Sequence, residues 1–416
     1  MNETLSFLYS LRNRGSSFGI DRMSRFVELL GNPQNDFPII HVAGTNGKGS
    51  VCAMLDSIYR TNGYRVGLFS SPHLIELGER VRVDGKNITE NEIQEWVRLL
   101  KPIAQKMEDE EVDGHPTFFE FMSAIAFLTF QKNRVDLAII ETGLGGRLDS
   151  TNVVTPELSI ITTISKDHCT ILGDTLEEIA TEKAGIIKRQ VPVLIGNLPS
   201  CAQEVIQKIA FQHEAPIHTI SNLKEEECPI TNLFGSYQRR NAALAFRSTE
   251  LLEKKLPLRS DLTHKGLNTV NILGRWQVIK GSPTIILDAC HNSDGALCLK
   301  ENLATLPQKP EIWIGVLGED RAEDIMKVVI EFACSLKLFE VQQPRACSID
   351  YLRSLIPDSF CGEVINFDLE KAKEELKNST SNKTILVTGS IYLIGDILSL
   401  LVDQDFDSKV DWNDLF

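Results

Sequence analysis

The sequence has no two cysteines in C-x-x-C spacing, and its nine cysteines are scattered over 416 residues. This odd, dispersed set fits a reducing compartment and argues against a structural zinc site. The first 15 residues, MNETLSFLYSLRNRG, contain Glu3 and have neither a long apolar core nor a small-residue cleavage site. We therefore expect no secretory signal and predict a cytoplasmic location.

Acidic residues outnumber basic ones by 57 to 43, and long apolar runs are scarce. The formal net charge is −14, which argues against general affinity for nucleic acid or for an anionic membrane surface. The most hydrophobic stretch, residues 385–402, carries Asp396 and two glycines, so it is typical of a buried strand and helix rather than a membrane span. We expect neither a nucleic-acid partner nor a membrane partner.

Repeats and low-complexity tracts are absent, and short β-rich runs alternate with amphipathic stretches instead. The runs of the first half are FPIIHVAG, YRVGLFSS, VDLAIIETG, ELSIITTIS and VPVLIG. This alternation predicts βα units and a mostly parallel sheet whose central strands are apolar on both faces. Ligands of such sheets bind at the carboxyl ends of the strands, where this chain places SSPH, ETGLGGRLDSTN and SKDH.

A second alternating series follows a change of character around residues 220–280. Its runs are PTIILDACHN, EIWIGVLGED, LKLFEVQQP, EVINFD and KTILVTGS. The chain length predicts about two or three domains, and 42% hydrophobic residues are enough for large cores. The sequence therefore predicts an α/β protein with an N-terminal P-loop-type domain around a mostly parallel sheet. A smaller C-terminal Rossmann-like α/β domain is expected to join it near residues 270–281.

The stretch IIHVAGTNGKGSV, residues 39–51, combines an apolar run with a glycine-rich turn. Its glycines permit backbone conformations closed to other residues, so main-chain N–H groups can converge on a phosphate. A helix predicted over residues 50–63 would add its N-terminal dipole, with Lys48 near the outer phosphates and Ser50 near Mg²⁺. The pattern G-x-x-x-x-G-K-[ST] is not met, so a plain glycine turn is the competing interpretation.

Two polar residues that follow apolar runs are candidate metal ligands. Glu141 ends the run LAIIE, where a carboxylate is a natural Mg²⁺ ligand. The alternative is an exposed glutamate at a strand end, but the following TGLGGRLD indicates close backbone approach to an anion. His168 in SKDHCT is expected at the same sheet edge, although a lone histidine is more often a surface or core residue.

The segment GDTLEEIATEKAGIIK predicts a helix with clear ends. Thr175 and Glu178 have capping-box spacing, and Gly185 is a typical stop. Lys183 then falls in the last turn, where a lysine complements the helix dipole.

Three polar residues of the second half are candidates for ligand contact. Asp288 and His291 come just past an apolar strand, and Arg275 could neutralise a transferring phosphate. Taken singly these are weak signals, because arginines and aspartates on loops are mostly solvated.

Taken in order, these segments resemble the folate branch of the Mur ligases, which comprises dihydrofolate synthase and folylpolyglutamate synthase. The resemblance spans nearly the whole chain, and GTNGKGS and ETGLGGRLD are highly specific. The other matching segments are FGIDRM, GLFSSPHL, ERVRVDGKNIT, PTFFEF, DHCTILGDTLEEIATEKAGIIK, QRRNAALA, LGRWQ, ILDACHN and VTGS. The resemblance implies an ATP-binding P-loop domain of the Mur ligase central type over residues 1–272. It implies a glutamate-binding C-terminal Mur ligase domain over residues 273–416.

The activity implied by this resemblance is ATP-dependent amide ligation. ATP phosphorylates the carboxylate of a pterin-bearing acid, and the α-amine of L-glutamate then displaces the phosphate. The implied substrates are dihydropteroate, reduced folates and L-glutamate, and a monofunctional folylpolyglutamate synthase is the alternative to a bifunctional enzyme. The implied cofactors are ATP, two Mg²⁺ ions and a carbamylated Lys183, with a monovalent cation as a further candidate. A monomer is expected.

The resemblance also implies roles for individual residues. The nucleotide-binding candidates are Gly44, Thr45, Asn46, Gly47, Lys48, Gly49, Ser50, Asn241, Arg275 and Asp288. The metal-ligand candidates are Ser50, Ser71, Glu141, His168 and Lys183. The substrate candidates are Ser10, Leu11, Arg12, Asn13, Thr117, Leu148, Asp149 and Ser390. The catalytic candidates are Lys48, Lys183 and His291, and a carbamate on Lys183 replaces the dipole interpretation.

Two departures from the family pattern stand beside matched residues. Ser293 occupies the place of a usual proline, and Tyr237 that of a common histidine. We interpret both as tolerable changes in loop shape.

Three rival interpretations remain beside the folate branch. A peptidoglycan-precursor Mur ligase would need a UDP-sugar-binding domain before the phosphate loop, for which about forty residues are too few. A P-loop regulatory ATPase without ligase activity and a non-catalytic folate-binding paralogue are the others. The complete set of Lys48, Glu141, His168 and Lys183 argues against the non-catalytic paralogue.

Overall fold

The computed structural model describes residues 3–11, 19–111, 113–379 and 382–403. Contacts divide the chain into two compact units. Unit 1 comprises residues 1–232 and 239–270, and unit 2 comprises residues 233–238 and 271–416. The chain therefore crosses from one unit to the other three times. The sequence analysis placed one junction near residues 270–281 and predicted no short excursion at 233–238.

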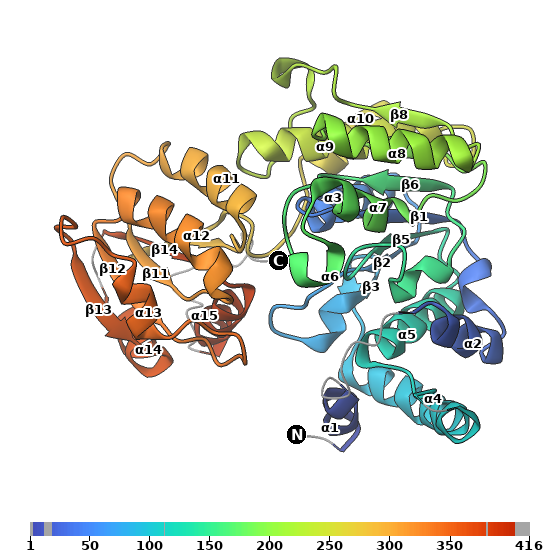
Figure 1. The fold of residues 1–416 in the computed structure, drawn as a ribbon, viewed down its shortest axis with the longest axis horizontal. Coiled ribbons are helices and arrows are strands. Elements are labelled where there is room, and N and C mark those ends of the chain that lie inside the picture. The colour runs from blue at the N-terminus through green and yellow to red at the C-terminus, as the bar shows by residue number, and fades with distance from the viewer. Residues whose placement is uncertain (1–2, 12–18, 112, 380–381, 404–416) are drawn as a thin grey trace. The chain divides into compact units, whose positions relative to one another are not determined.

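Unit 1 is built on a mostly parallel sheet of eight strands in the order β4-β3-β2-β5-β1-β6-β7-β8 (Figure 1). Its strands are β1 (Ile39–Ala43), β2 (Val66–Phe69), β3 (Val81–Val83), β4 (Lys86–Asn87), β5 (Leu137–Glu141), β6 (Leu158–Ile161), β7 (Val193–Ile195) and β8 (Ile217–Thr219). The pairs β2–β3 and β3–β4 are antiparallel, and the other pairs are parallel. Every residue of β1 and β5 is buried, as expected for central strands covered on both faces.

The α-helices of unit 1 comprise two that precede β1 and others that follow the strands, as the alternating pattern predicted. They are α1 (Glu3–Ser10), α2 (Asp21–Leu29), α3 (Lys48–Thr61), α4 (Glu90–Glu110), α5 (Phe118–Asn133), α6 (Cys169–Leu172), α7 (Leu176–Ala184), α8 (Ser200–Gln212), α9 (Ser236–Leu252, whose first turn lies in unit 2) and α10 (Ser260–Leu267). The prediction that the helix after the phosphate loop starts at residue 50 was wrong by two residues. Gly47 adopts φ 86° at the N-cap, so the chain turns into the helix already at Lys48.

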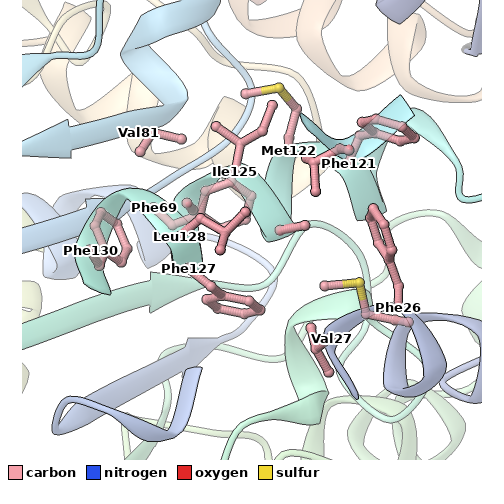
Figure 2. Packing of buried hydrophobic residues seen from close by; sticks show 14 of the residues in the cluster. Phe26, Val27, Phe69, Val81, Phe121, Met122, Ile125, Phe127, Leu128 and Phe130 are labelled. Carbon is pink, nitrogen blue, oxygen red and sulfur yellow. The ribbon is translucent and has the colours of Figure 1, made fainter. Parts of the chain in front are cut away.

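The largest hydrophobic cluster described in unit 1 forms around helix α5, whose residues 120–130 are all buried (Figure 2). Phe121, Phe127 and Phe130 are fully buried there. Phe130 packs so closely over β2 that a Cβ on Gly67 would lie 2.6 Å from its ring. Burying one such side chain contributes about 1.5–3 kcal/mol, so this cluster anchors the β2 and β5 side of the sheet.

Unit 2 contains a six-stranded sheet in the order β13-β12-β11-β14-β10-β9. Its strands are β9 (Gln277–Ile279), β10 (Thr284–Asp288), β11 (Glu311–Ile314), β12 (Ser335–Phe339), β13 (Glu363–Phe367) and β14 (Thr384–Thr388). Its helices are α11 (Ser293–Leu303), α12 (Glu319–Phe332), α13 (Ile349–Ser354), α14 (Leu369–Asn378) and α15 (Ile391–Asp403). Only the β9–β10 pair is antiparallel within the described sheet. The predicted Rossmann-like α/β arrangement is confirmed, including a buried strand and helix over residues 385–402.

A buried ionic cluster lies within unit 2. The Lys337 amine is 3.0 Å from a carboxylate oxygen of Glu311 and also contacts Glu375. Lys383 reaches the same two carboxylates, at 3.1 and 2.6 Å. The Lys337 amine also lies 4.3 Å from the centre of the Phe367 ring. The two amines and the two carboxylates thus offset one another's charge and form hydrogen bonds, and both conditions are needed to keep ionised groups buried.

The segment 233–238 packs on other parts of unit 2. The Phe234 ring stacks on Trp276 with centroids 5.6 Å apart, and the Ser236 hydroxyl donates to Glu301 at 2.7 Å.

Among the described residues, no helix is both long and apolar enough to traverse a bilayer.

Candidate active site

The glycine-rich turn after β1 has the geometry of a phosphate loop. Gly44 has φ 150°, and a Cβ on it would lie 1.9 Å from the Thr162 hydroxyl oxygen. A Cβ on Gly47 would lie 2.6 Å from the amide oxygen of Asn241, a residue of α9. Both positions therefore require glycine for conformation and for space. Thr45 and Asn46 complete the turn, and Gly49 and Ser50 lie in the first turn of α3.

The turn is fixed to the end of the neighbouring strand β6. Thr45 N–H donates to the Thr163 carbonyl at 2.8 Å, and Asn46 N–H donates to the Thr163 hydroxyl at 2.9 Å. The shape of the turn is therefore set before a ligand arrives, which lowers the cost of ordering it on binding.

Two lysine amines converge on the phosphate loop. The Lys48 amine donates to the carbonyls of Gly44 and Thr45 at 2.9 and 3.1 Å, and the Lys183 amine donates to the same Gly44 carbonyl at 2.9 Å. Lys183 is 4% exposed. Its burial, reinforced by the positive charge of Lys48, lowers its pKa to about 7. A substantial fraction of Lys183 is therefore a neutral amine near pH 7.

Helix α7 delivers Lys183 to this position, with the ends that the sequence predicted. Thr175 and Glu178 form the capping box, and the helix stops before Gly185. A Cβ on Gly185 would lie 2.3 Å from the Cα of Arg147, so the end of α7 packs tightly against the loop after β5. The dipole interpretation of Lys183 does not account for its burial.

The metal-ligand candidates follow the carboxyl ends of adjacent strands. Glu141, the last residue of β5, is buried, and its carboxylate accepts the N–H of Ser71 at 3.3 Å. Ser50 lies buried in the first turn of α3, and His168 precedes α6. No group of three or more His, Cys, Asp or Glu side chains within the described ranges could hold a metal ion. The hydroxyl, carboxylate and imidazole groups of these candidates suit an ion such as Mg²⁺, which takes most of its ligands from phosphate and water and only a few from protein side chains.

A cavity of about 300 Å³ in unit 1 brings together several predicted substrate residues. Thr117, Leu148 and Asp149 line it, together with Ser71 and the buried side chains of Arg80 and Glu120. Ser71 thus belongs both to the cavity wall and to the surroundings of Glu141.

Hydrogen bonds hold two walls of the cavity. Glu120 accepts the N–H and the hydroxyl of Thr117 at 2.7 and 2.9 Å, and Arg22 donates to it at 2.8 Å. On the other wall, Arg80 donates to the His73 ring at 2.8 Å and lies over the Phe118 ring. The Thr117–Glu120 pair is a capping box in PTFFEF, so the sequence carried a signal for Glu120 that we did not use. No local pattern pointed to Arg80.

The remaining substrate candidates of unit 1 lie in the N-terminal segment. The Ser10 hydroxyl donates to the Phe7 carbonyl at 2.6 Å, and Leu11 is buried in the hydrophobic cluster around α5. Arg12 and Asn13 lie outside the described residues.

Unit 2 gathers its own candidates at the carboxyl ends of β10 and β14. Asp288 ends β10 and is paired in register with Thr388, whose hydroxyl donates to the Asp288 carbonyl at 2.8 Å. Ser390, just after β14, is buried. The His291 ring lies 2.9 Å from the Ala289 carbonyl, to which Arg275 also donates at 3.3 Å.

Burial raises the pKa of Asp288 to about 6, against the opposing effects of the Arg275 charge and of backbone N–H donors. Burial and the Asp288 charge also raise the pKa of Tyr237, which belongs to the same unit. Tyr237 is therefore a neutral phenol at working pH. Ser293, the second residue that departs from the family pattern, donates its hydroxyl to Asp324 at 2.6 Å.

Residues 42–261, more than half of the chain, match the Mur ligase middle domain. The chain belongs to the Mur ligase family. It is 34% identical to dihydrofolate synthase/folylpolyglutamate synthase of Bacillus subtilis, over 94% of this chain and 97% of that protein. The predictions of family, fold class and ligase activity are confirmed.

Solved structures of relatives match almost the entire Mur ligase chain. Escherichia coli FolC in complex with DHPP and ADP is 26% identical, with a TM-score of 0.82 over 97% of this chain and 98% of that one. A bifunctional folylpolyglutamate synthase/dihydrofolate synthase with Mn, AMPPNP and L-glutamate bound is 27% identical, with a TM-score of 0.81 over 97% and 98%. Nucleotide and divalent metal are thus bound by proteins similar to this Mur ligase along their whole length.

Proposed function

We propose that this chain is an ATP-dependent amide ligase that joins L-glutamate to dihydropteroate and to reduced folates through an acyl phosphate. The observation that carries the proposal is the convergence of Lys48 and Lys183 on the Gly44 carbonyl, in the unit that also holds the cavity. Ser71 lines the cavity, and its N–H donates to Glu141, which is paired in register with Val42 of the strand that precedes Gly44. Ligands reported for the relatives, DHPP, ADP, AMPPNP and L-glutamate, support the same substrates here.

In this proposal each group of residues of unit 1 has one task. The N–H groups of residues 47–50, at the start of α3, and the Lys48 amine hold the phosphates, so the charge that develops on them meets fixed donors. Thr117, Leu148 and Asp149 line the cavity proposed to receive the pterin end of the acid, and the shape of this cavity orients the carboxylate of the acid for phosphorylation. Ser50, Ser71, Glu141 and His168 would hold Mg²⁺, which supplies charge neutralisation when bound.

The nucleotide contacts that the resemblance implies, Asn241 in unit 1 and Arg275 and Asp288 in unit 2, stay predictions. His291 and Ser390 are proposed to bind glutamate. The assignment of ATP binding to residues 1–272 and glutamate binding to 273–416 is part of this proposal.

We further propose that Lys183 carries a carbamate. The neutral amine adds to CO₂ and releases one proton, so a potential cation becomes an anion beside the proposed Mg²⁺ site. The pKa of about 7 supports this step, because only the unprotonated amine is nucleophilic. Two Mg²⁺ ions, a monovalent cation, a monomeric state and a cytoplasmic location stay predictions.

A substrate panel tests the proposal. Purified protein with Mg-ATP and L-glutamate is given dihydropteroate or a reduced folate, while ADP release and product mass are followed. We expect ADP release to depend on both the acid and glutamate, with products one glutamate heavier. Equal ADP release without a pterin acid would indicate a regulatory ATPase, and turnover with reduced folates only would indicate a monofunctional folylpolyglutamate synthase.

A further inference from the structure

A row of hydrogen-bonded side chains lies behind the cavity wall of unit 1. His41 on β1 has its Nε2 atom 2.8 Å from the hydroxyl oxygen of Thr151. That hydroxyl lies 2.5 Å from Oδ1 of Asp149. His41 and Thr151 are fully buried, and Asp149 lines the cavity. The row therefore runs from a central strand to the substrate pocket.

The proton positions in this row follow from the partners of Asp149. Its carboxylate also accepts the N–H groups of Thr151 at 2.9 Å, Gly143 at 2.8 Å and Leu144 at 3.0 Å. Backbone N–H groups only donate, so the carboxylate is the acceptor throughout, and the Thr151 hydroxyl donates to it. The hydroxyl oxygen then accepts from His41, whose proton must sit on Nε2.

The other nitrogen of the His41 ring agrees with this assignment. Within the described part of the chain, Nδ1 is buried and has no hydrogen-bond partner. Burial, with the added charge of Lys188, lowers the pKa of His41 to about 3. The ring is thus a neutral, fixed donor at any working pH and does not act as a switch.

The end of the row fixes the cavity wall. Each carboxylate oxygen of Asp149 accepts two hydrogen bonds. Oδ2 accepts the N–H groups of Gly143 and Leu144, and Oδ1 accepts the N–H and the hydroxyl of Thr151. Gly143, Leu144, Leu148, Asp149 and Ser150 all line the cavity. Four donors fill the acceptor capacity of one carboxylate, so the loss of any one loosens this closed turn.

We infer that His41 and Thr151 are positioning residues for the acid substrate: they fix the Asp149 carboxylate and thereby the shape of the pocket wall that receives the pterin end. Neither residue lines the cavity. His41 lies on β1, three residues before Gly44, so the cavity wall is held against the strand that leads into the phosphate loop. The inference rests on the proposed function, because it takes the cavity as the site of the pterin acid.

The test compares KM values for dihydropteroate and for ATP in single variants. Thr151→Val removes the hydroxyl with little change of shape, and Thr151→Ser restores it. Thr129→Val is the matched control, since Thr129 is equally buried on α5 and its hydroxyl has no partner among the described residues. His41→Gln keeps a donor near the Nε2 position, and His41→Leu removes it.

We expect Thr151→Val to raise KM for dihydropteroate about tenfold, the effect of losing one hydrogen bond to a charged group. KM for ATP should stay within about twofold, because separate bonds to Thr163 hold the phosphate loop. Thr151→Ser and His41→Gln should lie near the wild type, and His41→Leu near Thr151→Val.

Several outcomes would overturn the inference. These are an unchanged KM for dihydropteroate in Thr151→Val, an equal rise in Thr129→Val, or an equal rise in KM for ATP. Unfolding of both Thr151→Val and His41→Leu without a selective KM effect would assign the row to core stability alone. If the wild type shows no pterin-dependent ADP release, the proposed function fails instead, and the two failures are distinguished.

Discussion

The two units each bury a lysine to the same extent, with opposite surroundings. Lys183 in unit 1 and Lys337 in unit 2 are both 4% exposed. Two carboxylates and two aromatic rings surround the amine of Lys337. The amine of Lys183 donates to a carbonyl and is influenced by a second cation, Lys48.

The difference separates a structural charge from a reactive amine. A buried ion pair keeps its charge because its partners offset the lost hydration. A buried amine near another cation gives up its proton, and a perturbed pKa of this kind is typical of functional sites. Equal burial alone would not have distinguished the two lysines, whereas the sign of the neighbouring charge does.

The largest effect is expected at Lys183. Lys183→Ala should lower glutamate-dependent ADP release by at least about 10²–10³-fold, because the proposed anionic carbamate beside the metal is lost. Added acetate or bicarbonate should restore part of the rate in an ADP-release assay, since the missing feature is a negative charge. Full activity of the variant without additives would remove the carbamate role.

At Lys337 we expect a substitution to lower stability rather than activity. Lys337→Met leaves Lys383 as the one remaining cation for the two carboxylates Glu311 and Glu375, so it should lower the free energy of unfolding by about 3 kcal/mol. The kcat measured well below the melting temperature should be unchanged, because Glu311 lies at the start of β11, opposite to the strand ends that carry the site candidates. Urea unfolding and steady-state kinetics check both statements. A lower kcat with unchanged stability would invalidate the contrast between the lysines.

An intermediate effect is expected at Glu141. Glu141→Gln should raise the Mg²⁺ concentration for half-maximal rate about tenfold and lower turnover, because a charged oxygen ligand is lost. Glu157→Gln, at a partly exposed glutamate paired with Lys255, is the control and should leave the Mg²⁺ titration unchanged. An unaltered metal dependence in Glu141→Gln would count against ligation by Glu141.

The last comparison concerns the pH dependence of stability, for which Lys183 and Glu311 have different pH windows. The pKa of Lys183 falls from its ordinary 10.5 to about 7, so between these values only the unfolded chain holds the proton. Stability from this group therefore rises with pH above about 7 and is flat below. Burial tends to raise the pKa of Glu311, but hydrogen bonds from Trp313, Lys337 and Lys383 outweigh it and lower the pKa to about 2. Stability from Glu311 is present above its ordinary 4.5 and is lost as the pH falls toward 2.

Unfolding curves of Lys183→Ala and Glu311→Gln, each subtracted from the wild type, measure these two dependences. A flat difference for Lys183→Ala between pH 7 and 10 would contradict the lowered pKa. For Glu311→Gln, the difference should vanish toward pH 2.

Much of the fold could be predicted from sequence because the periodic signals are local. The apolar runs around residues 39–43 and 137–141 became central strands, and the Thr175–Glu178 capping box set the start of α7. Contacts between distant segments left no such trace. The approach of Lys183 to Gly44 spans 139 residues, and that of His41 to Thr151 spans 110. The sequence also carried no local signal for His41, because a single polar residue in an apolar strand forms no recognisable pattern.

The short excursion of the chain at residues 233–238 limits how this protein can be dissected. A fragment starting at residue 273 would lack Phe234 and Ser236, leaving one face of Trp276 bare and Glu301 without its hydroxyl donor. Truncation at a single point therefore yields an incomplete half, and a chimaera with a relative would need to exchange the 233–238 insert together with the C-terminal portion. Segmental labelling or split-protein work on this chain should accordingly place its junctions at 232, 238 and 270 rather than at one site.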